Sequence, residues 1–392
     1  MVFWYGYYLF AGAILFMMYV WPKSTREWKY AYISVLWLIA SFRYMYGDDY
    51  EMYVSLFEAG DIPNVLAMAP SIEPTFQYMV QLYNEIGLSA QCLFLTYATV
   101  ILFFFYKGCQ AYFSDSKSQL MLLLLYATTT LTGGYFFGLN GIRQAAAISI
   151  LFWGSQFLLS NEWLKFVSTF ILAFCFHYSA VFFLPVVFLV KKKIPYVCAL
   201  GGMAAALACT LSGMSAQIFL RLLSLAVSLL DAYNRYENQI DMLDISTEFP
   251  SSTAFVCVIY ITILVMVYCK RIKIDTRFEI FIYNATTVYI LLRSLTSFGV
   301  EGANLAANLH RVEIYYLFPF LLFIVYFLQK VFREKRSMKM GFLAVWILVF
   351  AYVNLHTFAV GANDPKKVVP PSVITDSIED QFNFSLLNPY VW

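Results

Sequence analysis

The sequence predicts an all-α membrane protein with about twelve transmembrane helices, and two observations support this class. Hydrophobic residues make up 61% of the 392 residues, whereas only 13% are charged. A soluble domain carries about 25% charged residues, so too few groups are available here to face water. Apolar runs of the length that crosses a bilayer as a helix also follow one another with no soluble-looking segment between them.

The apolar runs give the candidate spans, taken in chain order. They cover residues 2–20, 30–42, 88–106, 119–137, 143–159, 163–176, 178–190, 195–212, 252–269, 278–298, 311–329 and 340–358. The run at 2–20 has no basic residue before it and ends in Trp21-Pro22, so we expect a retained span rather than a signal peptide. Residues 163–190 could instead form one long helix, but Lys165 and Lys191 would then lie on opposite sides of the membrane.

The distribution of basic residues orients the spans, because short cytoplasmic connections are enriched in Lys and Arg. With alternate connections assigned to the cytoplasm, 18 of the 26 basic residues lie there. They are Lys23, Arg26, Lys29, Lys107, Lys117, Lys165, Lys191, Lys192, Lys193, Lys270, Arg271, Lys273, Arg277, Lys330, Arg333, Lys335, Arg336 and Lys339. The acidic stretch 231–248 and both termini then lie outside. We therefore expect a transmembrane domain at 1–358 and an external tail at 359–392.

Two external segments are amphipathic rather than uniformly apolar. Residues 73–86 and 215–230 each present an apolar face, so we expect helices that lie along the membrane interface and could roof a cavity. The seven cysteines fall inside or at the ends of apolar runs and form no CxxC pair. We expect no disulfide, no metal site and no cofactor.

Eight basic residues are left outside, and the six that precede the tail are all arginine. Arg43, Arg143, Arg293 and Arg311 each stand at the predicted external end of a span. Arginine carries a permanently charged planar fork that binds phosphate through two parallel hydrogen bonds. As a set they therefore indicate an anion-binding layer. Each one could instead reach toward lipid headgroups or pair with an acidic neighbour.

A pair of carboxylates follows the second span. Asp48 and Asp49 come after Gly47, which permits a sharp turn, and before Tyr50. Such carboxylates could orient an arginine, accept a proton from a sugar hydroxyl or bind a divalent cation. One of them could equally cap a helix over 50–58.

Further polar groups fall in the same predicted external layer. Arg143 and Gln144 open the fifth span, and a helix N-terminus with free N–H groups favours an anion. His177 stands at the tip of a predicted hairpin, and His310 adjoins Arg311. A lone histidine on an apolar face is more often structural, although an ionisable group at membrane depth favours function. His356, near the end of the last span, is expected to be structural.

These residues give the chain a resemblance to the EpsG and O-antigen polymerase (Wzy) family of bacterial polysaccharide polymerases. The similar stretches run in family order along nearly the whole chain. They are Phe42-Arg43 with Gly47-Asp48-Asp49-Tyr50 and Tyr53, Glu73-Pro74, Gly141-Ile142-Arg143-Gln144-Ala145-Ala146-Ala147, Phe176-His177-Tyr178-Ser179-Ala180 with Pro185, Arg311 with Tyr315 and Tyr316, and Asn388-Pro389-Tyr390. The family usually has a small or hydroxyl residue at the position of Asp48.

The resemblance implies a metal-independent glycosyltransferase of the GT-C type in the bacterial inner membrane, with its active site facing the periplasm. Residues 1–358 would then form the catalytic domain, and the tail at 359–392 would be periplasmic. It would transfer a growing glycan from undecaprenyl pyrophosphate to a hydroxyl of a second lipid-linked repeat unit. Arg143 and Arg311 would bind pyrophosphate with support from Arg43 and Arg293. Asp49, Asp48 or His177 would accept the proton. Substrate contacts are further expected from Gln144, Tyr50, Tyr315 and His310.

Two alternatives remain open. An O-antigen ligase or another polyprenyl-dependent transferase would share this architecture but use a different acceptor. A flippase or transporter would need charges at mid-membrane, whereas the arginines here are expected at one face. The expected partners are the lipid-linked donor and acceptor glycans, membrane lipid and, from the resemblance alone, a chain-length regulator. No nucleic acid is expected.

Overall fold

The computed structural model describes residues 2–43, 49–129, 134–212, 214, 244–246, 251–270, 272–296, 299–301, 311–332 and 335–362. Within these ranges the regular structure is almost entirely helical, as the sequence predicted. Two strands of three residues, β1 (Asp244–Ser246) and β2 (Gly299–Glu301), pair antiparallel. The chain divides into two compact units, one formed by residues 1–181 with 334–392 and one by residues 182–333.

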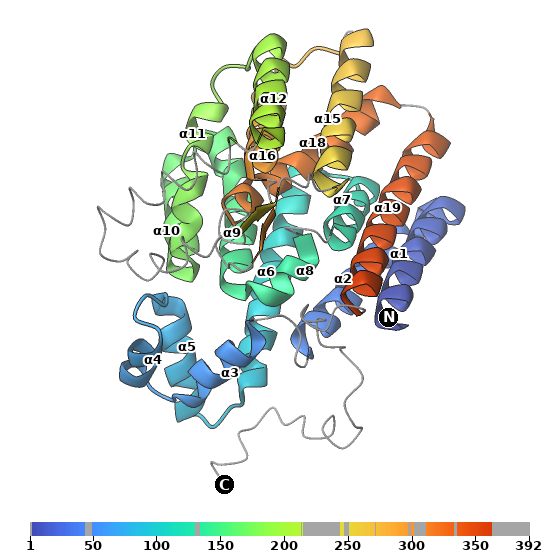
Figure 1. Cartoon of the computed structure of the whole chain (residues 1–392). Helices are drawn as coiled ribbons and strands as arrows, with labels where there is room; N and C mark the ends of the chain where they lie inside the picture. The colour runs from blue at the N-terminus through green and yellow to red at the C-terminus, as the bar shows by residue number, and fades with distance from the viewer. Residues whose placement is uncertain are drawn as a thin grey trace. The chain divides into compact units, whose positions relative to one another are not determined.

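The first unit contains twelve of the described α- and 3-10 helices (Figure 1). These are α1 (Val2–Val20), η1 (Pro22–Ser24), α2 (Thr25–Ser41), α3 (Tyr50–Glu58), α4 (Ile62–Met68), α5 (Pro74–Glu85), α6 (Ala90–Tyr112), α7 (Ser116–Thr128), α8 (Gly134–Asn140), α9 (Ile142–Leu159), α10 (Trp163–Phe176) and α19 (Arg336–Ala362). The short helices α3, α4 and α5 form a group beside one end of α6 (Figure 1).

Local sequence sets where several of these helices start. The Asp115 carboxylate accepts a hydrogen bond from the Ser118 backbone N–H at 2.8 Å, which caps α7. Asp61 caps α4 in the same way through Asn64. Helix α5 begins at Pro74, whose ring fixes a helical φ angle and whose missing N–H costs nothing in a first turn. Glu73 is thereby held at the boundary of α5, in extended backbone.

Helices α6, α9 and α10 pack closely because glycines lie in their interfaces. A Cβ atom on Gly154 of α9 would lie 2.5 Å from Thr169 Oγ1 of α10, and one on Gly108 of α6 would lie 2.3 Å from the Phe152 ring of α9. Only glycine permits these approaches, since real side-chain contacts do not occur at such distances. Helix α9, which carries Arg143, is therefore fixed between two neighbours.

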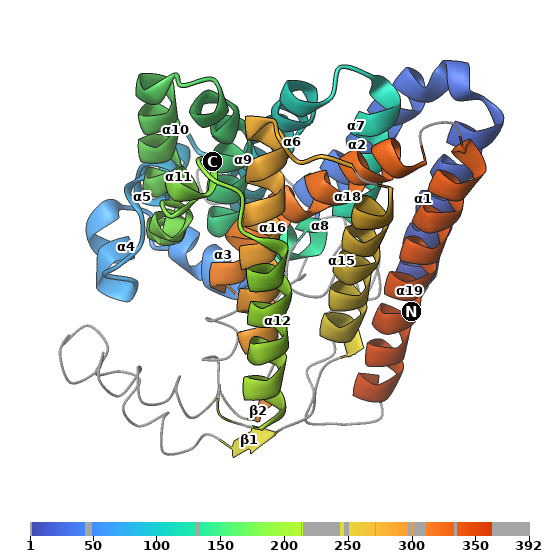
Figure 2. The ribbon, with the colours of Figure 1, turned by 90° about the horizontal axis from the view of Figure 1, so that it is seen from above.

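The first and last helices of the described chain lie side by side. Figure 2 shows α1 along α19, and α1 also packs against α2 and α7. The Tyr7 hydroxyl of α1 donates to the Ala127 carbonyl at 2.7 Å. The Tyr7 ring meets Phe136 edge-on with 4.8 Å between ring centroids.

The second unit is arranged around α16 (Arg277–Thr296). It contains the end of η2 (Tyr178–Phe183), together with α11 (Val186–Leu189), α12 (Tyr196–Leu211), α15 (Ser251–Cys269), η4 (Ile314–Tyr316) and α18 (Leu317–Val331). Helix α16 contacts α11, α12, α15 and α18. The Asn284 amide of α16 donates to the carbonyls of Leu189 and Lys192 at 2.7 and 2.8 Å. A buried amide thus satisfies the backbone of the turn between α11 and α12.

Most of the predicted apolar runs are helices in the structure. Runs 2–20, 143–159, 163–176, 195–212, 252–269 and 278–298 match described helices to within about two residues, the usual spread of helix boundaries. Two runs are interrupted. Helix α7 ends at Thr128 and α8 starts at Gly134, where φ is +73° and a Cβ would lie 2.5 Å from the Thr129 carbonyl oxygen. Run 178–190 is divided into η2 and α11, with Pro185 between them.

The alternative of one long helix over 163–190 is wrong. Helix α10 ends at Phe176, and His177 has extended backbone with φ −159° and ψ 124°. By length and composition, two described helical segments suffice to cross a membrane, at residues 90–112 and 311–331, and several others are apolar but shorter. The number of twelve spans therefore stays a prediction. The amphipathic segment 73–86 forms α5, whereas 215–230 lies outside the described residues.

Candidate functional site

One buried carboxylate joins two predicted site residues in the first unit. Glu73 is 2% exposed, and its two oxygens bind different partners: Oε2 accepts from the Arg143 guanidinium and Oε1 is bonded to His177 Nδ1. The Tyr178 backbone N–H also donates to Oε1, at 3.4 Å. The structure therefore brings together three positions that lie 70 and 104 residues apart in the chain.

The three residues meet because three helix ends meet. Glu73 precedes α5, Arg143 is the second residue of α9, and His177 follows the last residue of α10. The Thr75 hydroxyl donates to the Cys175 carbonyl at 2.8 Å, which fastens the start of α5 to the end of α10. The packing of α9 against α10 then places Arg143 at the same level.

Aromatic rings surround the Arg143 guanidinium. Its central carbon lies 5.7 Å from the Tyr53 ring centroid and 5.8 Å from that of Phe76, which are cation–π distances. Two buried polar atoms here have no hydrogen-bond partner within the described part of the chain, Arg143 Nε and the Tyr97 hydroxyl oxygen. Buried polar atoms are usually paired, so these two atoms are exceptions within the cluster.

The charges of the cluster determine how it ionises. Burial raises the pKa of the Glu73 carboxyl, but the hydrogen bond from His177 and the charge of Arg143 outweigh burial, so the pKa lies below its ordinary value. Burial raises the pKa of the Tyr53 hydroxyl despite the nearby charge of Arg143, so Tyr53 stays neutral. An ionised carboxylate only accepts hydrogen bonds, so His177 donates to Glu73 through Nδ1. The other ring nitrogen of His177, Nε2, is not used in this bond.

Acidification is expected to destabilise the protein through Glu73. Since the folded-state pKa is lowered, this stabilisation is complete above the ordinary value of 4.5 and is lost as the pH falls through the folded value. Melting temperatures in detergent, measured from neutral pH to well below the ordinary carboxyl value, should fall more steeply for the wild type than for Glu73→Gln. Parallel curves for the two proteins would contradict this assignment.

Arg43, Asp49 and Tyr50 lie in the same unit. Arg43 is 1% exposed, and its guanidinium carbon lies 4.4 Å from the Phe94 ring centroid. Tyr50 stacks on the same ring with 4.8 Å between centroids. The Asp49 backbone N–H donates to Asn140 Oδ1 at 2.9 Å, which connects the start of α3 to the residue before the Gly141 turn.

Asp49 is the N-cap residue of α3, but its side chain makes no capping hydrogen bond, so the predicted helix cap is not made by Asp49. Gln144 is buried in α9 at 2% exposure. Asp48 lies outside the described residues, as does His310.

The other two arginines lie in the second unit. Arg293 and Glu313 are buried, and Arg293 Nη1 donates to Glu313 Oε1 at 2.5 Å. The Thr296 hydroxyl donates to the second Glu313 oxygen at 2.8 Å. Arg311 opens the apolar segment 311–331, and Tyr315 is buried at 1% exposure in η4. Pairing with an acidic neighbour, one of the predicted alternatives, is therefore what Arg143 and Arg293 do. A single layer of all four arginines stays a prediction.

Sequence reasoning missed Glu73 and Tyr97 as members of the site. Glu73 was noted only as part of a motif and as the start of an interfacial helix, and Tyr97 lies inside an apolar run. The one available signal was a carboxylate directly before a proline-initiated helix, in a segment predicted to lie on the same side of the membrane as the arginines. Within the described ranges, no cluster of three His, Cys, Asp or Glu side chains is arranged to hold a metal ion.

Comparison with known proteins identifies the family. Residues 28–367 match the model of the EpsG family, which is associated with polysaccharide biosynthesis. No curated protein and no solved structure gives a significant match. The family and the apolar helices together indicate a membrane protein of polysaccharide biosynthesis. With its match spanning most of the chain, this protein belongs to the EpsG family.

Proposed function

We propose that the protein is a repeat-unit polymerase of polysaccharide biosynthesis, acting on the periplasmic face of the inner membrane. It transfers a glycan from undecaprenyl pyrophosphate to a hydroxyl of a second lipid-linked repeat unit. The observation that carries this proposal is the cluster of Arg143, Glu73 and His177. It combines a cation for a diphosphate with an imidazole for a proton in one partly exposed site, where Arg143 and His177 side chains are each 19% exposed.

The proposed reaction exchanges one C–O bond for another. The bond between the anomeric carbon and the diphosphate oxygen breaks, and the acceptor hydroxyl oxygen bonds to that carbon. Negative charge grows on the departing diphosphate, where a fixed guanidinium stabilises it. Arg143 suits this role because Glu73 holds its guanidinium in place and its side chain reaches the surface.

The acceptor hydroxyl must lose a proton in the same step. His177 suits this because Glu73 holds Nδ1 and so fixes which ring nitrogen carries hydrogen, leaving Nε2 to accept. Glu73 therefore acts as a positioning residue for both partners. Asp49, connected to Asn140 near Arg143, is the second candidate base, with Asp48 beside it in sequence.

The remaining predicted residues take supporting roles in this proposal. Arg311 is retained as the second diphosphate ligand, and Gln144, Tyr50, Tyr315 and His310 as substrate contacts. Arg43 and Arg293 are assigned to the support of neighbouring groups, since Arg43 lies over Phe94 and Arg293 is bound to Glu313.

Product chain length tests the function. We expect the protein, reconstituted in vesicles with a lipid-linked repeat unit of its own pathway, to produce a ladder of longer lipid-linked glycans. In a strain without the protein, single-unit glycan should accumulate on the acceptor. Long chains that remain on undecaprenyl pyrophosphate would indicate a ligase instead. Repeat units trapped in the cytoplasmic leaflet would indicate a flippase.

A further inference from the structure

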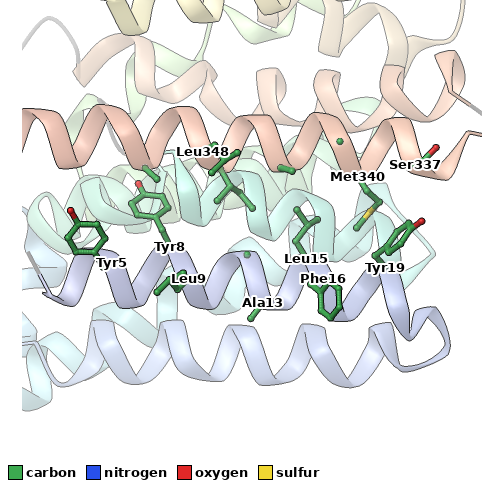
Figure 3. Close-up of a pocket in the computed structure, with 15 residues that line it drawn as sticks. Tyr5, Tyr8, Leu9, Ala13, Leu15, Phe16, Tyr19, Ser337, Met340 and Leu348 are labelled. Carbon is green, nitrogen blue, oxygen red and sulfur yellow. The ribbon is translucent and has the colours of Figure 1, made fainter.

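An apolar groove runs between the first and last helices of the first unit. It has a volume of about 930 Å³ and is lined by α1 and α19 alone (Figure 3). No charged side chain lines it. Gly12 and Gly341 leave open space, because a Cβ on either would meet nothing within 4 Å. The polar atoms drawn along it are hydroxyls, with Tyr5 near one end and Tyr19 and Ser337 at the other (Figure 3).

The end marked by Tyr19 and Ser337 is also the basic end. Helix α1 stops at Val20, and exposed Lys23 follows in η1, with exposed Arg26 in the first turn of α2. Exposed Lys335 directly precedes α19, and Lys339 lies about one turn beyond Lys335. The acidic neighbours are fewer. Glu27 is exposed beside Arg26, and Asp115, whose charge acts on Lys339, already caps α7.

We propose that this groove binds an anionic phospholipid, with an acyl chain along α1 and α19 and the phosphate among Lys23, Arg26 and Lys335. An uncharged apolar channel suits the chain, and basic side chains at one end suit the phosphate. Tyr19 stands near the end of α1, and tyrosines near the ends of membrane helices often meet lipid headgroups. The inference depends on the protein being embedded in a bilayer and is independent of the polymerase reaction.

Native mass spectrometry on delipidated protein tests the proposal, with phosphatidylglycerol and phosphatidylcholine as the probes. We expect phosphatidylglycerol to be retained more strongly. Lys23→Ala with Lys335→Ala should lower its retention by about fivefold for each lysine removed. The control is Lys191→Ala with Lys192→Ala, which removes the same charge from exposed positions in the second unit and should leave retention unchanged.

Filling the groove provides a second, charge-independent test. Gly341→Leu should abolish retention of the lipid, because a Cβ at this position meets nothing within 4 Å and the leucine side chain would extend into the groove. Gly201→Leu is the matched control, since Gly201 of α12 also has open space around it but lies in the second unit. Melting temperatures of both variants in detergent should match the wild type.

Three results would overturn the proposal. Equal retention of the two phospholipids would leave no role for the basic end. If the Lys191 and Lys192 variant lost as much phosphatidylglycerol as the Lys23 and Lys335 variant, retention would follow the net charge of the protein. A protein dimer that disappears with Gly341→Leu would show that a second copy, and not a lipid, covers the groove.

Discussion

Replacing Arg143 with alanine is expected to lower the rate of glycan polymerisation by about 10²–10³-fold, the usual cost of removing one preorganised group that stabilises transition-state charge. The proposed role requires a fixed cation, and the structure fixes Arg143 through Glu73, Tyr53 and Phe76. Long-chain glycan should disappear and the single repeat unit should remain unconverted, measured as product length with purified lipid-linked repeat unit.

Two further variants separate charge from geometry. Arg143→Lys keeps the charge but loses the planar fork, so its activity should lie between wild type and Arg143→Ala. Arg277→Ala, which removes an arginine from the predicted cytoplasmic side, should retain normal activity. Normal chain lengths in Arg143→Ala, with unchanged melting temperature, would exclude Arg143 as a ligand of the diphosphate.

Replacing Glu313 with alanine is expected to destabilise the second unit by about 3–5 kcal/mol, because it would leave the buried Arg293 cation without its carboxylate. Arg293 is 3% exposed and Glu313 is fully buried, so solvent cannot replace the lost partner. Thr296 would lose its acceptor as well. The free energy of unfolding in detergent micelles measures the effect.

A double replacement tests whether the loss of stability comes from leaving the Arg293 cation without the Glu313 carboxylate. Arg293→Met combined with Glu313→Leu should recover much of the loss, since a buried ion pair can often be replaced by apolar residues of similar volume. Glu162→Ala, which removes the carboxylate of an exposed pair with Lys165, should have little effect. A Glu313→Ala protein as stable as the wild type would contradict the buried-pair assignment.

The helices could be predicted well where the sequence carries a local signal. Helix α10 has its predicted ends because Trp163 to Phe176 is one apolar run between Glu162 and His177. The run 119–137 is also apolar, yet helix α7 ends at Thr128 and helix α8 begins at Gly134. The break depends on a left-handed backbone at that glycine, and the composition of the run does not reveal it.

The candidate site was predictable only in part. Arg143 and His177 stood out because ionisable groups in apolar surroundings are rare and demand an explanation. Their common partner was not predictable, since nothing local in residues 73–86 specifies that Glu73 meets α9 and α10. The amphipathic pattern described one face of α5, whereas the position of its first residue depends on how three helices pack.

The shared carboxylate has a consequence for mutational scanning. Glu73 uses one oxygen for a cation and the other for an imidazole, so its loss disturbs both at once. The effects of substitutions at Glu73, Arg143 and His177 on activity will therefore not be additive. Glu73→Ala combined with a substitution at either of the other two positions should be scarcely less active than Glu73→Ala alone. Among other EpsG-family sequences, these three positions should be gained and lost together.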